Sequence, residues 1–329
     1  MKAAVIGAGT WGTALAIVLA KNGHEVMLWS KFPAEIKELM ETRRHRNLPG
    51  AVLPENITGE TALRAVCEDC AVLVLAVPSI YVRETAREMS PYVSPGKIVV
   101  TVAKGIEEGS LLTMTELVEQ EIPAARAAVL SGPTHAEEVS RLLPTTIVAG
   151  AREEQTARFV QDCFMNESFR VYINTDVKGV EIGAALKNVI ALAAGMADGL
   201  GYGDNTKAAL ITRGIAEISR LGMKMGCRPE TFAGLSGIGD LIVTCASMHS
   251  RNRRAGILIG EGRNYEEAMR EVGQVVEGVY AAKAALELSE RYEVSMPIVE
   301  KVNEILFAGK PVREAVRELM LRDRKEEGI

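Results

Sequence analysis

The sequence lacks an excess of basic residues and any long uninterrupted apolar run. Its 329 residues carry a formal net charge of −5, which argues against nucleic acid as a partner, since that role usually needs a basic face. No run approaches the roughly 18 continuous apolar residues that a bilayer span requires. The apolar stretch at the N-terminus has the pattern of a buried strand rather than of a signal peptide. We therefore expect a cytoplasmic protein that is not an integral membrane protein.

Cysteine is scarce, and its positions form no metal-binding pattern. The chain has five cysteines, and an odd number scattered over such a length is typical of a reducing compartment. Cys67-x-x-Cys70 has the spacing of a redox pair, but it lacks the thioredoxin setting and a second pair for zinc. We expect Cys67 near a helix end and Cys70 just before a strand, with a redox role as the alternative. No metal site is predicted.

The sequence also lacks internal repeats and a linker rich in serine, glycine or proline. The pattern of its apolar residues changes once along the chain. Strand-like runs recur in the first half: Ala71–Val77, Lys97–Ala103, Ala127–Leu130, Thr145–Ala149 and Phe169–Ile173. After Asn174 such runs stop, and apolar residues recur at the period of helices. The expected helices are Val177–Met196, Thr206–Leu221, Pro229–Leu235, Arg251–Glu261, Tyr265–Glu271, Val276–Tyr292, Pro297–Leu306 and Val312–Leu321.

This change from strand-like runs to helical periodicity predicts two domains. A chain of this length can bury two cores, and strands that alternate with helices predict a doubly wound, mostly parallel sheet. We expect residues 1–176 to form an α/β domain of this kind and residues 177–329 to form an all-helical domain. The crevice between them, at the carboxyl ends of the strands, is the default position for an active site.

The most informative local pattern is Gly7-x-Gly9-x-x-Gly12, because it follows an apolar run over residues 3–6. A helix follows the glycines, and then a second strand that ends at Ser30. Gly7 permits a tight turn, Gly9 lets a pyrophosphate approach the backbone, and Gly12 lets the helix lie close to its strand. The pattern therefore predicts a Rossmann domain in which the amide groups of a helix N-terminus face an anion.

The end of the second strand indicates the cofactor. NAD-selective sites usually place a carboxylate there for the ribose 2′-hydroxyl. This chain has Ser30 and Lys31, with Arg43, Arg44 and Arg46 in an expected loop beyond them. Since Ser30 and Lys31 could bind a 2′-phosphate, we predict NADP as the cofactor, with NAD tolerated. The alternative is that Lys31 only solvates the end of the strand.

A lysine interrupts the apolar helix expected after residue 176. The stripe that contains it comprises Val180, Gly183, Ala184, Lys187, Ala191 and Ala194. Lysine is almost never fully buried without a partner. Lys187 is therefore either an acid/base group whose pKa is lowered by desolvation or a lysine that snorkels from the edge of the stripe. This helix alone leaves both interpretations open.

Polar residues follow two of the predicted strands, at the edge of the sheet where ligands bind. Lys104 comes directly after Lys97–Ala103, and Gly132 and Thr134 come shortly after Ala127–Leu130. Their turn leads into a helix whose free amide groups, with the Thr134 hydroxyl, could bind a polar substrate. The neighbouring His135 could act as an acid/base group, although a lone histidine in a turn is more often structural.

Two segments of the helical half combine charge with turn residues. Asp240 follows Gly237-Ile238-Gly239, where an aspartate is normally a turn or cap residue; its functional alternative is to fix and polarise a catalytic lysine. The segment Ser250-Arg251-Asn252-Arg253-Arg254 opens a helix. Its arginines, hydroxyl, amide and helix dipole together predict a phosphate site, and a solvated basic face is the alternative.

With these segments assembled, the chain resembles bacterial-type NAD(P)-dependent glycerol-3-phosphate dehydrogenases. The resemblance covers nearly the whole length, in GAGTWG, the VP at Val77-Pro78, KGIE, SGPTHAEEV, AALKNVIALAAG, GYGDNTKAALITRG, LSGIGDLIVTC, SRNRRAG and VVEGVYAA. The glycine motif is generic, but LKN, GIGDL and SRNRRAG at these separations are highly specific. The family's fold, a Rossmann domain followed by an all-helical substrate domain, agrees with the change from strand-like runs to helical periodicity.

The resemblance implies a set of site residues, with Lys187 as the proton donor and acceptor and with Lys104 and Asp240 as further catalytic residues. Those implied to bind substrate are Lys104, Gly132, Thr134, Lys187, Asp240, Ser250, Arg251 and Asn252. Those implied to bind the cofactor are Gly7, Gly9, Thr10, Trp11, Gly12, Lys31, Lys104, Ala136, Arg251, Val275 and Glu277. Thr10 replaces a serine that is common in the family and keeps its hydroxyl.

The implied reaction is reversible hydride transfer between the nicotinamide C4 and C2 of dihydroxyacetone phosphate, which yields sn-glycerol 3-phosphate for glycerophospholipid synthesis. Lys104 would stabilise the charge on the carbonyl oxygen, and Lys187 would deliver the proton. A free lysine is about three units too basic to be a neutral amine at neutral pH. Burial and Lys104 would lower the pKa of Lys187, whereas Asp240 would raise it.

Other functions stay open as alternatives. Another two-domain Rossmann reductase, of the ketopantoate or 6-phosphogluconate type, would act on a substrate with a remote carboxylate. A non-catalytic NADPH-sensing protein would be expected to lack Lys104, Lys187 or Asp240, and all three are present. A homodimer is also expected if the alanine- and glycine-rich helix exposes one of its faces.

Overall fold

The computed structural model describes residues 1–324, 326 and 327, and the chain divides into two compact units. Unit 1 comprises Met1–Lys104 and Leu112–Val177, and unit 2 comprises Gly105–Leu111 and Lys178–Ile329. The short segment Gly105–Leu111 therefore belongs with the helical unit although the chain on both sides of it belongs to the sheet. The sequence does not reveal that this segment joins unit 2. Only two of its residues, Ile106 and Leu111, belong to the core of that unit, which is too few to form a recognisable pattern.

Unit 1 is built on an eight-stranded sheet in the order β3-β2-β1-β4-β5-β6-β7-β8. The strands are β1 (Lys2–Ile6), β2 (Glu25–Trp29), β3 (Ile57–Glu60), β4 (Val72–Leu75), β5 (Ile98–Thr101), β6 (Arg126–Ser131), β7 (Thr145–Ala151) and β8 (Phe169–Asn174). Neighbouring strands are parallel, except that β6 and β7 are antiparallel. The predicted α/β class and mostly parallel sheet are confirmed.

The edge strand β3 has no counterpart among the strands predicted from the sequence. Its four residues, Ile57-Thr58-Gly59-Glu60, include only one buried apolar side chain, so they lack the apolar run that marks the inner strands. The glycine is required by packing rather than by a turn. A Cβ atom on Gly59 would lie 2.4 Å from Cγ2 of Ile36, so the strand can approach the preceding helix only without a side chain there.

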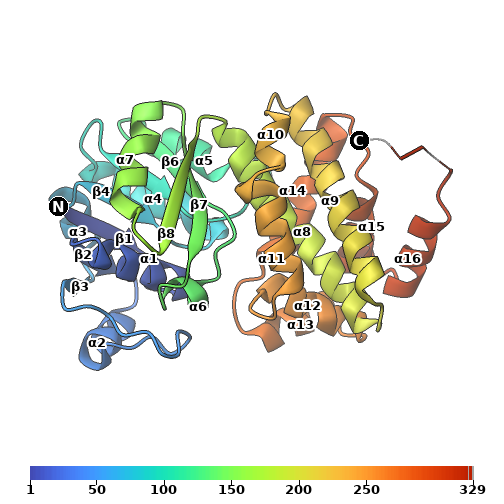
Figure 1. Ribbon diagram of the computed structural model, residues 1–329, viewed down its shortest axis with the longest axis horizontal. Coiled ribbons are helices and arrows are strands. Elements are labelled where there is room, and N and C mark those ends of the chain that lie inside the picture. Colours follow the sequence, from blue (N-terminus) through green and yellow to red (C-terminus); the bar gives the residue numbers. More distant parts are fainter. Residues whose placement is uncertain (325, 328–329) are drawn as a thin grey trace. The chain divides into compact units, whose positions relative to one another are not determined.

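Helices cover both faces of the sheet (Figure 1). They are α1 (Thr10–Lys21), α2 (Pro33–Thr42), α3 (Leu63–Asp69), α4 (Val82–Met89), α5 (Met114–Glu121), α6 (Ala136–Val139) and α7 (Glu154–Phe164). Side chains alternate along a strand. Val5 and Val74 therefore join the core formed with α1 and α7, whereas Ile6 and Leu75 join the core formed with α3, α4 and α5. The strand ends are thus held from both faces.

Unit 2 is helical and is organised around α8 (Val177–Gly199) (Figure 1). The other helices are α9 (Asp204–Lys224), α10 (Pro229–Phe232), α11 (Asp240–Ala246), α12 (Arg251–Gly260), α13 (Tyr265–Val272), α14 (Glu277–Arg291), α15 (Pro297–Ala308) and α16 (Val312–Met320). By length and composition α8 could cross a bilayer, but its most apolar 18-residue window is 94% buried inside the structure. That is the environment of a core helix, which needs no polar face.

Glycines bring α8 and α12 into direct backbone contact. A Cβ atom on Gly195 would lie 2.1 Å from the carbonyl oxygen of Arg253, and one on Gly256 would lie 2.2 Å from the carbonyl oxygen of Leu192. The next glycine on each helix, one turn later, repeats the contact, because residues four apart share a helix face. The two helices therefore hold each other at a separation that no larger residue permits.

The cysteines are buried free thiols, as far as the described residues extend. Cys67 lies in α3 and Cys70 directly follows it, as predicted. Burial raises the pKa of Cys67 to about 12 and that of Cys70 to about 11. Both thiols are therefore protonated at neutral pH, and a protonated buried thiol is a poor nucleophile. Within the same residues, no three His, Cys, Asp or Glu side chains gather to form a metal site.

Candidate active site

The glycine turn between β1 and α1 has the form that a pyrophosphate needs. Gly7 has a φ of +120°, and a Cβ atom there would lie 2.6 Å from the carbonyl oxygen of Ala76. A Cβ atom on Gly12 would lie 1.9 Å from the Gly7 carbonyl oxygen, whereas nothing lies within 4 Å of that position on Gly9. Helix α1 begins at Thr10 with no acidic residue in its first turn. Its positive end is therefore open toward an anion.

A cavity of about 830 Å³ opens beside this turn, at the ends of β1, β2 and β4. Cofactor sites commonly enclose about 300–1,000 Å³, so the space suits a nucleotide. Its lining includes the glycine turn, Ser30 and Lys31. In the first turn of α1, the indole nitrogen of Trp11 is buried and has no hydrogen-bond partner in the described part of the chain. An unsatisfied buried donor is uncommon, although Trp11 is not among the residues that line this cavity.

The side chains at the end of β2 are engaged with carboxylates. Lys31 Nζ lies 3.1 Å from Glu84 and 3.5 Å from Glu88, and the hydrogen bond to Glu84 raises the pKa of Lys31. Ser30 is buried, and its hydroxyl donates to Glu35 at 2.5 Å. The end of the strand itself carries no carboxylate, but Glu35 reaches this point from the first turn of α2.

Lys104 follows β5 and reaches the loop that follows β6. Its Nζ donates to the carbonyl oxygen of Gly132 at 2.9 Å and to the hydroxyl of Thr134 at 3.3 Å. The Thr134 hydroxyl donates in turn to the Gly132 carbonyl oxygen at 3.0 Å. Because β5 and β6 are parallel neighbours, their carboxyl ends bring these predicted residues together. His135 is the N-cap of α6, and Ala136 is its first residue.

Lys187 is buried in the middle of α8 and has two polar partners. It is 5% exposed, and its Nζ donates to Asp240 Oδ1 at 2.7 Å and to Thr244 Oγ1 at 2.6 Å. Asp240 is 1% exposed, and the Thr244 hydroxyl donates to its backbone carbonyl oxygen at 2.6 Å. A snorkelling lysine would place its ammonium group in water. Of the two interpretations that the sequence leaves open, the structure therefore retains the buried one.

Asp240 stands at the start of a helix and not in a bend. A short π-helical turn, Leu235–Gly239, leads into α11, which begins at Asp240. The helices expected from the sequence do not include this one, because the glycines before Asp240 are typical of a turn. Gly237 instead serves close packing: a Cβ atom on it would lie 2.1 Å from the carbonyl oxygen of Phe232. Since residues four apart share a helix face, α11 directs both Asp240 and Thr244 toward the lysine.

The predicted phosphate residues lie at the N-terminus of α12. Ser250 caps the helix by accepting a hydrogen bond from the backbone of Arg253 at 3.2 Å. Asn252 is 7% exposed, and its amide donates to Asn188 Oδ1 at 2.9 Å and accepts from the backbone of Gly278 at 2.8 Å. These side chains shape the turn from within, whereas Arg251 is exposed. Asn188 is the neighbour of the buried lysine, so the same contacts join both parts of the site.

Asp198, which the sequence does not single out, fixes this end of α12 from α8. It accepts from Arg253 Nε at 2.7 Å and lies 2.9 Å from Lys207 Nζ. Arg253 also donates to the carbonyl oxygen of Ala246 at 2.7 Å. Arg253 is therefore a structural residue rather than part of a solvated basic face. Val275 and Glu277, both implied by the resemblance, lie just before α14 and at its first position.

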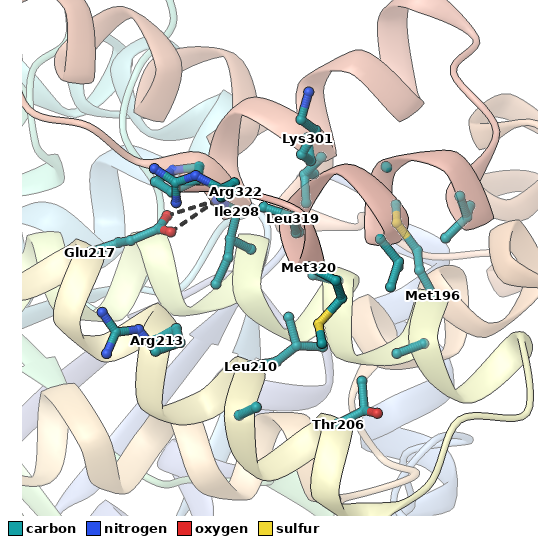
Figure 2. Close-up of a pocket in the computed structure, with 18 of the residues that line it drawn as sticks. Met196, Thr206, Leu210, Arg213, Glu217, Ile298, Lys301, Leu319, Met320 and Arg322 are labelled. Atoms are coloured by element: carbon teal, nitrogen blue, oxygen red, sulfur yellow. Dashed lines mark hydrogen bonds between the residues drawn. The ribbon is translucent and has the colours of Figure 1, made fainter. Parts of the chain in front are cut away.

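A second cavity, of about 460 Å³, lies within unit 2 and is lined by none of the predicted site residues (Figure 2). Glu217 lines it and is 3% exposed. Its carboxylate accepts from the backbone of Ile298 at 2.9 and 3.1 Å and from that of Val299 at 3.4 Å. Burial raises the pKa of Glu217 to about 7.

Glu217→Gln is expected to stabilise the protein at alkaline pH and to do little at acid pH. The pKa of about 7 in the folded state exceeds the roughly 4.3 of an exposed glutamate. The stability that this group contributes is therefore fully present below about pH 4 and is lost as pH rises through 7, by on the order of 4 kcal/mol. Thermal melts of wild type, Glu217→Gln and the exposed-site control Glu290→Gln across this range measure it. A Glu217→Gln difference that is independent of pH would contradict the assignment.

Two family profiles cover most of the chain. One, described as NAD-dependent glycerol-3-phosphate dehydrogenase N-terminus, matches residues 2–157, and its C-terminal counterpart matches residues 176–317. The chain is 62% identical over 324 residues to the glycerol-3-phosphate dehydrogenase [NAD(P)+] of Agathobacter rectalis, covering 98% of this chain and 96% of the relative. It is 54% identical over 330 residues to that of Fusobacterium nucleatum, covering 99% and 98%.

A comparison with solved structures also finds a glycerol-3-phosphate dehydrogenase. The crystal structure of glycerol-3-phosphate dehydrogenase from Coxiella burnetii superimposes with a TM-score of 0.93 at 37% identity, covering 98% of this chain and 99% of that chain. A ketopantoate reductase from Ralstonia eutropha matches with a TM-score of 0.62 at 15% identity, covering 97% and 100%. The second match is a likeness of fold alone.

Proposed function

The chain belongs to the NAD-dependent glycerol-3-phosphate dehydrogenase family, and we propose that it interconverts dihydroxyacetone phosphate and sn-glycerol 3-phosphate. The observation that carries the proposal is the buried Lys187, held by Asp240 and Thr244. It stands in a chain that is 62% identical, over 98% of its length, to a relative named for this activity. The favoured cofactor is NADPH, and NADH is also accepted.

The residues proposed to hold the cofactor lie mainly around the first glycine turn. They are Gly7, Gly9, Thr10, Trp11, Gly12, Lys31, Lys104 and Ala136, and the family resemblance adds Arg251, Val275 and Glu277. The open helix end and the cavity beside it support this assignment. When bound, the nicotinamide supplies the hydride that reduces C2 of the ketone.

In the proposed mechanism, Lys187 delivers a proton to the carbonyl oxygen as that oxygen gains negative charge. The carboxylate of Asp240, 2.7 Å from Nζ, favours the ammonium form and so keeps a proton available for reduction. In the oxidative direction the same nitrogen takes the proton back. Lys104 stabilises the oxyanion, and its hydrogen bonds to Gly132 and Thr134 orient its ammonium group.

The first turn of α12 is proposed to hold the phosphate of the substrate. Arg251 supplies a charged side chain, and the helix N-terminus supplies backbone donors and a positive dipole. Ser250 and Asn252 hold the turn in shape, because their side chains already have protein partners. Binding energy gained at the phosphate, away from the reacting carbon, can orient C2 for reaction.

Arg251→Ala is expected to raise KM for dihydroxyacetone phosphate by about 10- to 100-fold, the loss of a charge-assisted contact, while kcat changes only a few-fold. Removing a contact made equally in the ground and transition states has this signature. Initial rates of NADPH oxidation over a range of substrate concentrations measure it, with the exposed Arg263→Ala as the control. A loss confined to kcat would contradict the role in binding.

Acceptor specificity tests the proposed function as a whole. NADPH and NADH oxidation should be rapid with dihydroxyacetone phosphate and far slower with dihydroxyacetone, which lacks the phosphate. Ketopantoate should not be reduced. Turnover of ketopantoate without turnover of dihydroxyacetone phosphate would select the alternative reductase, and binding of NADPH without turnover of any acceptor would select the sensing protein.

We also propose that the product supplies glycerophospholipid synthesis and that the enzyme works in the cytoplasm; a homodimer would need an interface other than the helix face considered from the sequence. The buried, protonated thiols suit a reducing compartment. The small residues of α8 would not form the dimer interface, because they are buried within unit 2. Sedimentation analysis of the purified protein decides the oligomeric state, and a monomer at all concentrations would rule the dimer out.

A further inference from the structure

The loop that follows α2 is attached to the glycine turn by a buried histidine. His45 is 7% exposed, its Nδ1 accepts from the backbone of Asn47 at 3.1 Å, and its ring hydrogen-bonds to the backbone of Ala8. A ring that accepts at Nδ1 carries its proton on Nε2. The imidazole therefore links the loop to the glycine turn through these two hydrogen bonds. It sets the position of the loop relative to the place where a pyrophosphate would bind.

Arginines on either side of this histidine line the cofactor cavity. Arg44 and Arg46 are both exposed and both contribute to its wall. Neither guanidinium group has a hydrogen bond or ion pair with any described residue. Arg43 behaves differently, because its Nη1 donates to the carbonyl oxygen of Ile57 at 2.7 Å. The cavity thus has two available arginines, held in place by the histidine between them.

A carboxylate faces the same cavity from α2. Glu35 accepts the Ser30 hydroxyl at 2.5 Å and lines the cavity. It thereby stands at the end of β2, where NAD-dependent Rossmann proteins hold the ribose 2′-hydroxyl with an acidic residue. Lys31 is the cation nearest to this point in sequence, but it is paired with Glu84 and Glu88.

We infer that the ribose 2′ position of the cofactor is recognised by opposed groups, Glu35 for the hydroxyl of NADH and Arg44 with Arg46 for the phosphate of NADPH. Lys31 is not the discriminating residue. The inference rests on the proposed function, which requires nucleotide binding in unit 1. A carboxylate accepts a hydroxyl but repels a phosphate, and guanidinium groups match phosphate oxygens in pairs. Attraction and repulsion together then set the ratio of the two affinities.

Direct binding measurements test the inference without relying on turnover. Both tryptophans of the chain, Trp11 and Trp29, lie in unit 1, so energy transfer from them to the reduced nicotinamide reports binding. Wild type, Glu35→Gln, Lys31→Ala and the double variant Arg44→Ala/Arg46→Ala are titrated with NADPH and with NADH. Displacement by 2′,5′-ADP and by 5′-ADP isolates the effect of the 2′-phosphate from that of the nicotinamide.

The double arginine variant is expected to weaken NADPH and 2′,5′-ADP by about 10- to 100-fold and NADH by less than about 3-fold. Glu35→Gln is expected to shift the ratio in the opposite direction, several-fold toward NADPH. Lys31→Ala is expected to affect NADPH and NADH alike, so that the ratio of their affinities stays within about 3-fold of the wild-type ratio. Because neither guanidinium group has a partner among the described residues, the double variant should melt like wild type, which a thermal scan verifies.

Each other outcome contradicts a defined part of the account. If Lys31→Ala removes the preference for NADPH while the double arginine variant retains it, the inference is overturned and the proposed function stands. An unchanged ratio in all variants has the same meaning. If wild type binds neither dinucleotide, the proposed function fails, and the inference fails with it.

Discussion

Replacement of Lys187 by methionine is expected to lower kcat for reduction of dihydroxyacetone phosphate by about 10²- to 10⁴-fold, the range that general acid catalysis contributes. Methionine keeps much of the aliphatic stem within the alanine-rich core of unit 2 but cannot deliver a proton. KM should change much less, since the phosphate is held elsewhere. Initial rates of NADPH oxidation, with NADPH binding measured separately, give the two constants.

The control for this prediction addresses the Asp240 carboxylate, which loses its ion-pair partner in the Lys187→Met variant. Without Lys187, Asp240 is a carboxylate only 1% exposed and without its cation, and breaking such a buried pair costs about 3–5 kcal/mol. The double variant Lys187→Met/Asp240→Asn removes the isolated charge. It should recover much of the lost Tm and none of the lost kcat. Wild-type turnover by either variant would rule out the proton role.

Gly195→Ala is expected to destabilise the protein by several kcal/mol, beyond the roughly 1–3 kcal/mol typical of an overpacked core. The added methyl would lie 2.1 Å from the carbonyl oxygen of Arg253, and backbone cannot give way as a flexible side chain can. Helices α8 and α12 must separate, which also displaces the turn that carries Arg251. A lower midpoint in urea unfolding and a raised KM for dihydroxyacetone phosphate should therefore appear together.

A glycine without neighbours provides the matched control. Nothing lies within 4 Å of a Cβ atom on Gly203, whose φ is −89°. Gly203→Ala should therefore change stability by only about 0.5 kcal/mol, as for most exposed substitutions and weak N-cap changes. Equal stability of Gly195→Ala and wild type would show that the close contact between the helices is not essential.

The inner part of the sheet could be predicted from the sequence because its strands are buried on both faces. Val72–Leu75 is apolar at every position, which leaves little ambiguity. Strand β3 could not be predicted, because an edge strand needs few apolar residues and Gly59 interrupts its apolar pattern. Helix α11 was hidden by the glycines before Asp240, which look like a turn until the backbone of α10 is seen to approach them.

In the candidate site, the sequence indicates which residue types are unusual but does not indicate which residues they contact. An isolated lysine in an apolar helix is visible in the sequence, but its contact with Asp240 spans 53 positions and depends on how α8 and α11 pack. The bond between Asn188 and Asn252 spans 64 positions and has no local pattern. Glu35 has no signal in the sequence, because the usual carboxylate lies at the end of β2, whereas this one reaches that point from the first turn of α2.

The most direct test of the central claim follows a labelled hydride. Wild-type protein is incubated with dihydroxyacetone phosphate and NADPH that carries deuterium at both C4 positions, and the product is analysed by NMR. The proposed mechanism predicts sn-glycerol 3-phosphate with one deuterium at C2 for each NADPH oxidised. NADPH that stays reduced, or a product without deuterium at C2, would contradict it.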